Sequence, residues 1–382
     1  MGLEGRPEGS KLRTILKILA ATALLYVFLV GIKLMGGGCK SLAEGEDSIA
    51  RSLLLQATNP FVALFVGIFV TSIIQSSAVT TSIIVALVSD GVLPLPAAIP
   101  IVMGANIGTT VTNMLVSMGY VMRREEFKRA IGGAVVHDLF NVMVVVILLP
   151  LELATGYLEK TTLWLTGPLR DVGGIGGGTF DPLGPVLAPA LGLIRSIIGI
   201  PKGPGWAAGL TTLAGLVCIF CALISLVKLL RSMMLGAAES FISNVMGKSG
   251  CVGIVIGFII TASVHSSSIV TSLLVPMAAS GIMSVSHIFP ITIGANIGTT
   301  TTALIAALAG SPTGLAIALV HFLFNVSGLL IFYPIPAIRR IPVRLAERIG
   351  QFAGESRKLM VLYTLCLFFG VPGLLILINC LI

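Results

Sequence analysis

Two clusters of hydroxyl side chains interrupt apolar stretches of the chain. Residues 75–82 read QSSAVTTS, and residues 265–272 read HSSSIVTS. Hydroxyl groups donate and accept hydrogen bonds, as do glutamine and asparagine amides. A helix that begins in such a cluster adds backbone N–H groups and a partial positive charge. The combination suits an oxyanion, and the hydroxyl, amide and carbonyl oxygens also suit a hard cation such as sodium.

A second motif, GANIGTT, occurs at 104–110 and again at 294–300. Its glycines permit local unwinding of a helix, which would free carbonyl oxygens for an ion. Pro100 and Pro290, four residues before each copy, favour a kink. The alternative is close packing of helices through small residues.

None of these four segments contains lysine or arginine. An anion held there deep in a membrane therefore needs mobile cations, which co-bound sodium would supply. With a tenfold gradient and 100 mV, two sodium ions release about 7.4 kcal/mol. A divalent anion moving inward costs about 4.6 kcal/mol. Two sodium ions are therefore sufficient for accumulation.

The motifs share one register, which indicates an internal repeat. The interval from Gln75 to His265 is the same as the interval from Gly104 to Gly294. Later the interval becomes shorter, since HDLFNV at 137–142 matches HFLFNV at 321–326. The first half has six more residues in the intervening loop.

The composition places this chain in a lipid bilayer. Hydrophobic residues make up 55% and charged residues 10%, with a mean hydropathy of +1.04, whereas soluble domains carry about 25% charged residues. The net charge of +8 comes from short basic clusters beside apolar runs. Membrane topology explains this placement, so no nucleic-acid partner is expected.

Runs 60–90 and 250–282 carry the hydroxyl clusters at their centres, and a straight helix would expose those groups to lipid. We expect each to form a re-entrant helical hairpin. The remaining runs are long enough to span a bilayer; they are 14–36, 92–119, 129–150, 206–231, 284–310, 312–335 and 359–381. All four basic clusters then fall on one side, with the N-terminus cytoplasmic and the C-terminus outside.

Because the first half has three spans, the second half enters the membrane from the opposite side. The expected fold is an all-α polytopic membrane protein of two inverted-topology repeats, each with a re-entrant hairpin and discontinuous helices. The expected units are a first repeat at 1–150, an external linker at 151–205, a second repeat at 206–335, and a basic cytoplasmic loop with the final span at 336–382.

His137 with Asn141, and His321 with Asn325, are each four residues apart on one helix face. A metal site and interhelical hydrogen bonding are both compatible with this spacing, and the absence of a matching carboxylate or thiolate favours hydrogen bonds. Asp138 lies inside a span without an acidic counterpart in the second half. It is either functional or ion-paired with a nearby basic residue.

From about residue 30 to 380 the chain resembles the type II sodium–phosphate cotransporter family, here as a bacterial member. QSSAVTTS, HSSSIVTS, both GANIGTT copies, VVHDLFNV and YPIPAIRR carry this resemblance. It implies a secondary transporter with inverted repeats, whose Gln-Ser-Ser hairpins hold phosphate and sodium. The family motif reads Gln-Ser-Ser-Ser in both halves, whereas Ala78 and His265 depart from it here.

These observations predict a symporter that couples inward sodium flux to inorganic phosphate uptake by alternating access in the cell membrane. The alternatives are a sodium-coupled carrier of another oxyanion and an intramembrane enzyme. Sodium is the co-transported ion, no organic cofactor is expected, and a homodimer is compatible with the sequence. The expected phosphate-binding residues are Gln75, Ser76, Ser77, Ser266, Ser267 and Ser268. The expected sodium ligands are Gln75, Asn106, Thr110, His265, Ser268, Thr271, Asn296 and Thr300.

Overall fold

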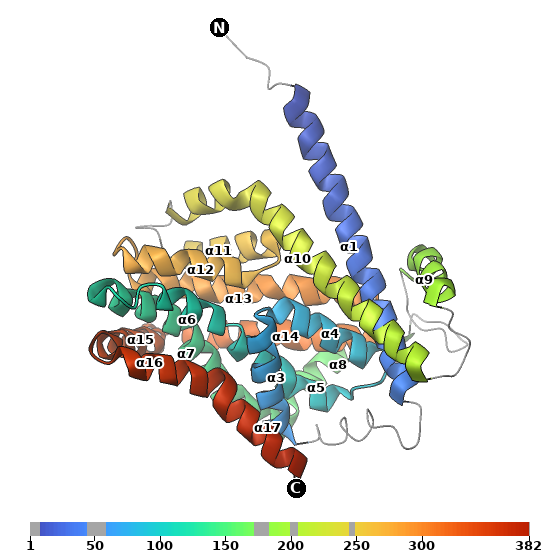
Figure 1. Cartoon of the computed structure of the whole chain (residues 1–382). Helices are drawn as coiled ribbons and strands as arrows, with labels where there is room; N and C mark the ends of the chain where they lie inside the picture. The colour runs from blue at the N-terminus through green and yellow to red at the C-terminus, as the bar shows by residue number, and fades with distance from the viewer. Residues whose placement is uncertain (1–7, 44–58, 172–182, 199–204, 244–248, 382) are drawn as a thin grey trace.

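The computed structural model describes residues 8–43, 59–171, 183–198, 205–243 and 249–381. Within these ranges the chain is helical and contains no strand (Figure 1). Seven helices are long and apolar enough to cross a membrane, which confirms the number of spans expected from the sequence. They cover Leu12–Ala43, Leu95–Met118, Arg124–Thr155, Ala207–Met234, Val285–Ala307, Pro312–Phe332 and Arg357–Asn379. The glycine-rich stretch GGIGGG at 173–178, within the expected external linker, lies outside the described residues.

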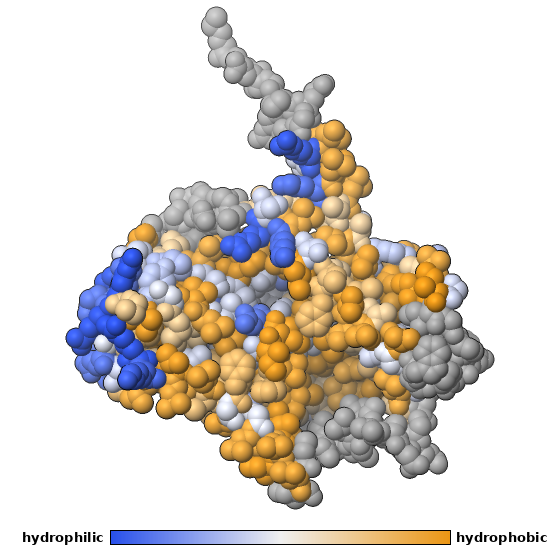
Figure 2. Space-filling model, viewed as in Figure 1, coloured by the Kyte–Doolittle hydropathy of each residue, from blue (hydrophilic) through white to orange (hydrophobic). Residues whose placement is uncertain are grey.

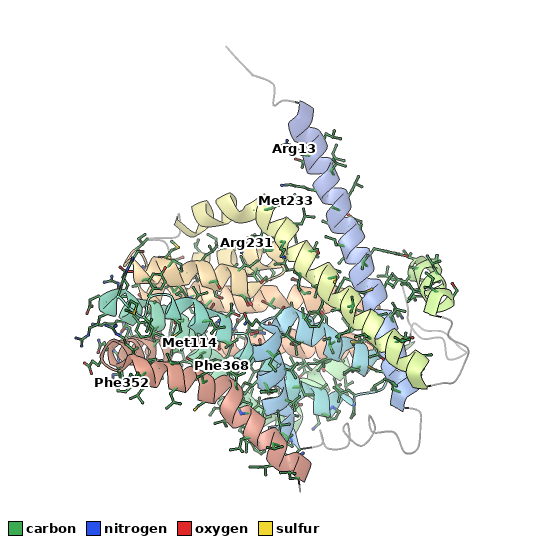
Figure 3. The ribbon with its side chains drawn as sticks, viewed as in Figure 1. Arg13, Met114, Arg231, Met233, Phe352 and Phe368 are labelled. Atoms are coloured by element: carbon green, nitrogen blue, oxygen red, sulfur yellow. The ribbon has the colours of Figure 1, made fainter. Side chains whose placement is uncertain are left out.

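The two longest helices, α1 (Glu8–Ala43) and α10 (Gly205–Ser243), pack against each other along one side of the molecule, and the N-terminal part of α1 extends beyond the other helices (Figure 1). Glycines allow this close approach, because a Cβ added at Gly31 would lie 2.9 Å from the Gly215 carbonyl oxygen. Arg13 of α1 and Arg231 of α10 lie toward the same end of the pair (Figure 3). The short helix α9 (Gly184–Ile198) packs beside both.

Each hydroxyl cluster marks a break between two short helices. In the first half α3 (Pro60–Ile74) ends and α4 (Ser77–Ser89) begins there. In the second half α11 (Gly250–Val264) is followed by α12 (Ser267–Ala279). The expected interruption of both runs is therefore present, and its placement as a re-entrant hairpin in a bilayer stays a prediction.

The GANIGTT copies differ in backbone structure. In the first, α5 (Leu95–Gly108) gives way to α6 (Val111–Met118) at two threonines. In the second, α13 (Val285–Ala307) runs through the motif without interruption. The unwinding expected in both copies is therefore wrong for the second. The first copy also has a bond that the second lacks, because Thr110 donates to Asp138 and Phe322 stands at the matching position of the second half.

The glycines of GANIGTT pack one helix directly onto another. A Cβ at Gly104 would collide with the carbonyl oxygen of Leu64 in α3, and one at Gly294 with that of Ile254 in α11. A Cβ at Gly108 would lie 2.5 Å from the Ile68 carbonyl oxygen. The contacts at Gly104 and Gly294 involve corresponding residues of the two halves, so the α3–α5 and α11–α13 pairs have the same packing.

The halves also contact each other crosswise. α4 packs on α13 and on α14 (Pro312–Phe332), both from the second half. α12 packs on α6 and on α7 (Arg124–Thr155), both from the first. The helix that follows each break, α4 or α12, therefore lies against helices of the other half. α8 (Tyr157–Asp171) packs on α14.

The segment expected as a basic loop contains an amphipathic helix, α15 (Pro336–Glu355). Val343, Ala346 and Ala353 are buried on one of its faces, and Gly350 lies against the Lys128 backbone of α7. This spacing of small residues makes a helix stable at this position. Hydrophilic residues gather over α15 and the beginning of α7 (Figure 2). The chain then continues through α16 (Arg357–Leu365), the π-helical turn Cys366–Gly370 and α17 (Val371–Leu381).

Candidate functional site

The backbone has the same unusual conformation at both breaks. Gln75 and His265 adopt φ values of 57° and 58°, in the left-handed region that side chains other than glycine rarely occupy. Each still donates its N–H, at 2.7 Å, to the carbonyl oxygen four residues earlier, Thr71 and Thr261 respectively. The residue that follows each is extended. The chain therefore turns out of one helix and starts the next within two residues.

The second helix of each hairpin begins inside the hydroxyl cluster. The Ser76 Oγ atom accepts the Val79 N–H at 3.3 Å and caps α4. Ser266 occupies the matching position of α12 and makes no side-chain cap. Ser77 and Ser267, the first helical residues, are each 3% exposed. Two helix N-termini with buried hydroxyls therefore stand at the breaks, and this arrangement can bind an oxyanion.

The remaining expected phosphate ligands differ in burial. Ser266 and Ser268 are half-buried, like Ser76, and Gln75 is exposed. Within each cluster these residues are sequence neighbours and share one break. The helices that begin in the two clusters, α4 and α12, each pack on helices of the other half.

Two histidines connect the halves through the asparagines of GANIGTT. The His137 Nε2 atom of α7 lies 2.6 Å from the Asn296 Oδ1 atom of α13. The His321 Nε2 atom of α14 lies 3.2 Å from the Asn106 Oδ1 atom of α5. Each histidine therefore pairs with the motif of the opposite half. The expected interhelical hydrogen bonding is confirmed, and no group of three metal-ligating side chains occurs in the described parts of the chain.

The His137 pair belongs to a longer buried chain of hydrogen bonds. The Asn113 amide nitrogen lies 3.1 Å from His137 Nδ1. Because an amide nitrogen can only donate, His137 Nδ1 accepts this bond and the imidazole hydrogen is on Nε2. Asn296 donates to the Asn141 Oδ1 atom at 2.8 Å, and Asn141 donates to the Asn106 carbonyl oxygen at 2.9 Å. This chain crosses α6, α7, α13 and α5.

Thr271 extends this chain to the second hairpin. Its hydroxyl lies 2.8 Å from the Asn113 Oδ1 atom and 2.9 Å from the Ser267 carbonyl oxygen. The expected sodium ligands Thr271, Asn296 and Asn106 are therefore linked through hydrogen bonds. Thr300 instead donates to the Ile297 carbonyl oxygen of its own helix. His265 lies 3.1 Å from the Thr302 hydroxyl, through its Nδ1 atom.

Asp138 accepts hydrogen bonds from two hydroxyl groups. Thr110 Oγ1 lies 3.0 Å from one carboxyl oxygen, and the Tyr363 hydroxyl lies 2.8 Å from the other. The side chain is fully buried. No lysine or arginine among the described residues forms an ion pair with it, so of the two alternatives the ion pair is wrong. Asp138 instead joins the first GANIGTT motif to the final span.

Some buried polar atoms of the second half lack a hydrogen-bond partner among the described residues, because an apolar residue replaces the polar one found at the matching position of the first half. Thr71 donates to the Thr80 hydroxyl at 3.0 Å, whereas the Thr261 hydroxyl has no hydrogen-bond partner within the described ranges. Val270 takes the place of Thr80 in the second half, so the accepting hydroxyl is missing there. Likewise His321 Nδ1 has no hydrogen-bond partner in the part of the chain that the structure describes, and Ala303 takes the place of Asn113. The two helix breaks are therefore equivalent in backbone, and the polar chemistry around them differs between the halves.

Sequence reasoning missed three residues of this network, Asn113, Thr302 and Tyr363. A signal for Asn113 was present, since Asn106, Thr110 and Asn113 follow a spacing of four and three residues typical of one helix face. Tyr363 had no such signal, because its partner lies 225 residues earlier.

Comparison with known proteins identifies the class of this chain. A sequence profile of the Na+/Pi-cotransporter family matches residues 27–158 and 208–340. This chain belongs to that family. The two matched segments contain the two halves defined by the motifs.

Similar proteins include the sodium-dependent phosphate transport protein 2A of Ovis aries, at 34% identity over 94% of this chain and 67% of that protein. The 2A protein of Rattus norvegicus is 35% identical over 96% of this chain and 68% of its own length. The 2B protein of Homo sapiens is 32% identical over 93% of this chain and 64% of its own length. No solved structure matches this chain.

Proposed function

We propose that this chain is a sodium-coupled phosphate symporter. The observation that carries the proposal is the pair of helix breaks in one register, each presenting a helix N-terminus and buried serine hydroxyls. Membership of the Na+/Pi-cotransporter family supports sodium and phosphate as the substrates. A transporter also accounts for the duplicated serines better than an intramembrane enzyme, which would need a nucleophile with its own base.

In this proposal phosphate binds at the N-termini of α4 and α12. The free N–H groups of the first turns and the hydroxyls of Ser76, Ser77, Ser266, Ser267 and Ser268 donate to its oxygens. Sodium binds at nearby amide, hydroxyl and carbonyl oxygens, including those of Asn106, Thr271 and Asn296. The positive charge of the sodium ions offsets the negative charge of the phosphate. No side chain of the two clusters can do so, since neither cluster contains a lysine or arginine.

The crosswise packing of the two halves supports alternating access as the transport mechanism. The two hairpins are proposed to be re-entrant, with the halves inverted in the membrane, the N-terminus cytoplasmic and the C-terminus outside. Each second hairpin helix lies on the spans of the other half. Rocking one half against the other would open the site first to one side and then to the other. The His137–Asn296 and His321–Asn106 bonds lie across the interface that must rearrange.

The test is uptake of radiolabelled phosphate by the purified protein in proteoliposomes. An inward sodium gradient should drive accumulation, and a potassium gradient of the same size should not. Arsenate and sulfate added outside distinguish a phosphate carrier from a carrier of another oxyanion. Ser280→Ala is a matched control variant, because the exposed Ser280 hydroxyl bonds only the Met277 carbonyl oxygen of its own helix. Uptake that is independent of sodium would overturn the proposal.

A further inference from the structure

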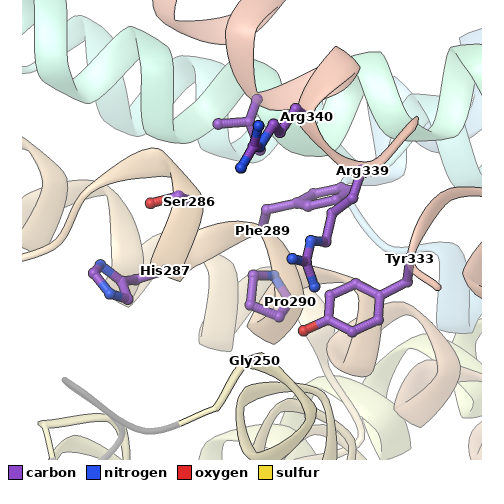
Figure 4. A pocket seen from close by; sticks show the side chains of 9 residues that line it. Gly250, Ser286, His287, Phe289, Pro290, Tyr333, Arg339 and Arg340 are labelled. Atoms are coloured by element: carbon purple, nitrogen blue, oxygen red, sulfur yellow. The ribbon is translucent and has the colours of Figure 1, made fainter. Parts of the chain in front are cut away.

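A cavity of about 290 Å³ lies away from the two helix breaks, where α11, α13 and α15 begin. Gly250, the first residue of α11, forms part of its wall. Phe289, Pro290 and Val343 form an apolar wall, and Tyr333 closes another side. Figure 4 shows Arg339 and Arg340 reaching into this space from α15.

The charges at this cavity are all of one sign. Arg339 is half-buried and lies over the Tyr333 ring, with its guanidinium carbon 5.0 Å from the ring centroid. This cation–π contact holds the guanidinium in place. Arg340 is exposed and lines the same cavity. No aspartate or glutamate lines the cavity, and neither arginine has an ion-pair partner among the described residues.

Helix N-termini add to the positive potential. None of α11, α13 and α15 has a side-chain cap on its first turn. At α13 the Ser284 hydroxyl instead bonds Ser286 Oγ and His287 Nδ1, both at 2.8 Å, and these two residues also line the cavity. At α11, a Cβ on Gly250 would collide with the Tyr333 hydroxyl. Glycine therefore allows that hydroxyl to lie against the uncapped turn.

We propose that this cavity is a second anion-binding site, which takes a phosphate group between Arg339, Arg340 and the first turns of α11 and α13. Planar guanidinium groups donate paired hydrogen bonds to phosphate oxygens, and uncapped turns offer backbone N–H groups. The apolar wall of Phe289, Pro290 and Val343 accepts the remainder of a larger ligand. Free inorganic phosphate and an anionic phospholipid headgroup share this chemistry.

The site is separate from the proposed transport site, so it is tested without transport. The readout is the rate at which phenylglyoxal modifies each arginine, measured by mass spectrometry in sodium-free potassium buffer. One arm adds potassium phosphate to delipidated protein in detergent. The other compares nanodiscs of phosphatidylcholine with and without phosphatidylglycerol. Arg344 and Arg348, exposed on the same helix and outside the cavity, are internal controls.

Occupation of the cavity should slow modification of Arg340 at least threefold and leave Arg344 and Arg348 unchanged. Protection in the detergent arm assigns the site to free phosphate, and protection only with phosphatidylglycerol assigns it to a headgroup. In Arg340→Gln, which alters an exposed side chain, protection of Arg339 should be lost. Equal protection of all these arginines would indicate a general surface effect and overturn the proposal, as would protection of none. Neither outcome bears on sodium-driven uptake.

Discussion

The His137 Nε2 atom and the Asn296 Oδ1 atom lie 2.6 Å apart, with both side chains at most 4% exposed. The two residues belong to opposite halves of an internal repeat. The matching pair, His321 and Asn106, is longer at 3.2 Å, and its asparagine oxygen also accepts from Asn325. The two histidine–asparagine pairs therefore differ in hydrogen-bond length and in the number of donors to the asparagine oxygen.

That inequality predicts different costs for the two histidines. His137→Ala leaves the Asn296 oxygen and the Asn113 amide without their partner, at about 1–3 kcal/mol for each unsatisfied group. In His321→Ala the Asn106 oxygen keeps its bond from Asn325. We expect His137→Ala to lower the thermal unfolding midpoint in detergent clearly more than His321→Ala. Equal shifts of the unfolding midpoint in the two variants would mean that both histidines contribute equally to stability, which would contradict the prediction.

The glycines of GANIGTT are expected to tolerate no side chain. Gly104→Ala and Gly294→Ala each push a methyl group into the backbone of α3 or α11, and such overpacking costs about 1–3 kcal/mol or more. Gly209→Ala in α10 is the control, because nothing lies within 4 Å of the added Cβ. Folded yield and unfolding midpoint measure the effect. Wild-type behaviour of Gly104→Ala would contradict the packing described.

Ser76→Ala and Ser267→Ala should each reduce phosphate uptake at least tenfold. Each removes a donor to a buried anion, worth about 1.5–3 kcal/mol for a charged partner. Ser76 also caps α4, and losing the cap costs about 1 kcal/mol of stability, so Ser267 is the cleaner probe. Initial uptake rates are compared with those of Ser280→Ala at equal amounts of folded protein. If both variants transport normally, the serines serve packing alone.

Asn106→Ala and Asn296→Ala should shift the sodium activation curve more than the phosphate curve. Amide oxygens are hard ligands. The Asn296 side chain lies in the buried network that reaches Thr271, and Asn106 joins that network through its backbone carbonyl oxygen. His321→Ala is the matched control, since it removes a hydrogen bond to Asn106 and keeps the amide. Uptake is measured over a range of sodium concentrations. An unchanged sodium curve in both asparagine variants would refute the assignment.

His265 predicts a pH-dependent sodium response. It occupies the break position that Gln75 holds in the first half, and its Nδ1 atom lies 3.1 Å from the Thr302 hydroxyl. A charged imidazole offers two donors and no acceptor, so it would repel a neighbouring sodium ion. His265→Gln should therefore flatten the difference in sodium activation between about pH 6 and pH 8. Identical pH responses in mutant and wild type would assign the effect to phosphate titration.

Local signals in the sequence were enough to locate the helices and their interruptions. The seven spans are confirmed because about 20 consecutive apolar residues form a membrane helix whatever their neighbours are. The breaks fall at Gln75 and His265 because hydroxyl clusters in apolar runs favour helix starts. The helix α15 inside the expected basic segment at 336–382 was not foreseen, because the sequence pattern showed its basic residues more clearly than the small residues that pack it on α7.

By itself, the sequence determined that this chain is a membrane protein of seven spans and two related halves. Composition, the length of apolar runs and the interval between repeated motifs can all be read from the chain without its fold. Only the tertiary structure decided which polar groups meet. Asn113 bonds His137, Tyr363 bonds Asp138, and Thr271 reaches Asn113 from the other half of the chain. An amide or hydroxyl bonds equally well to many partners, so its partner is chosen by the helices that pack around it.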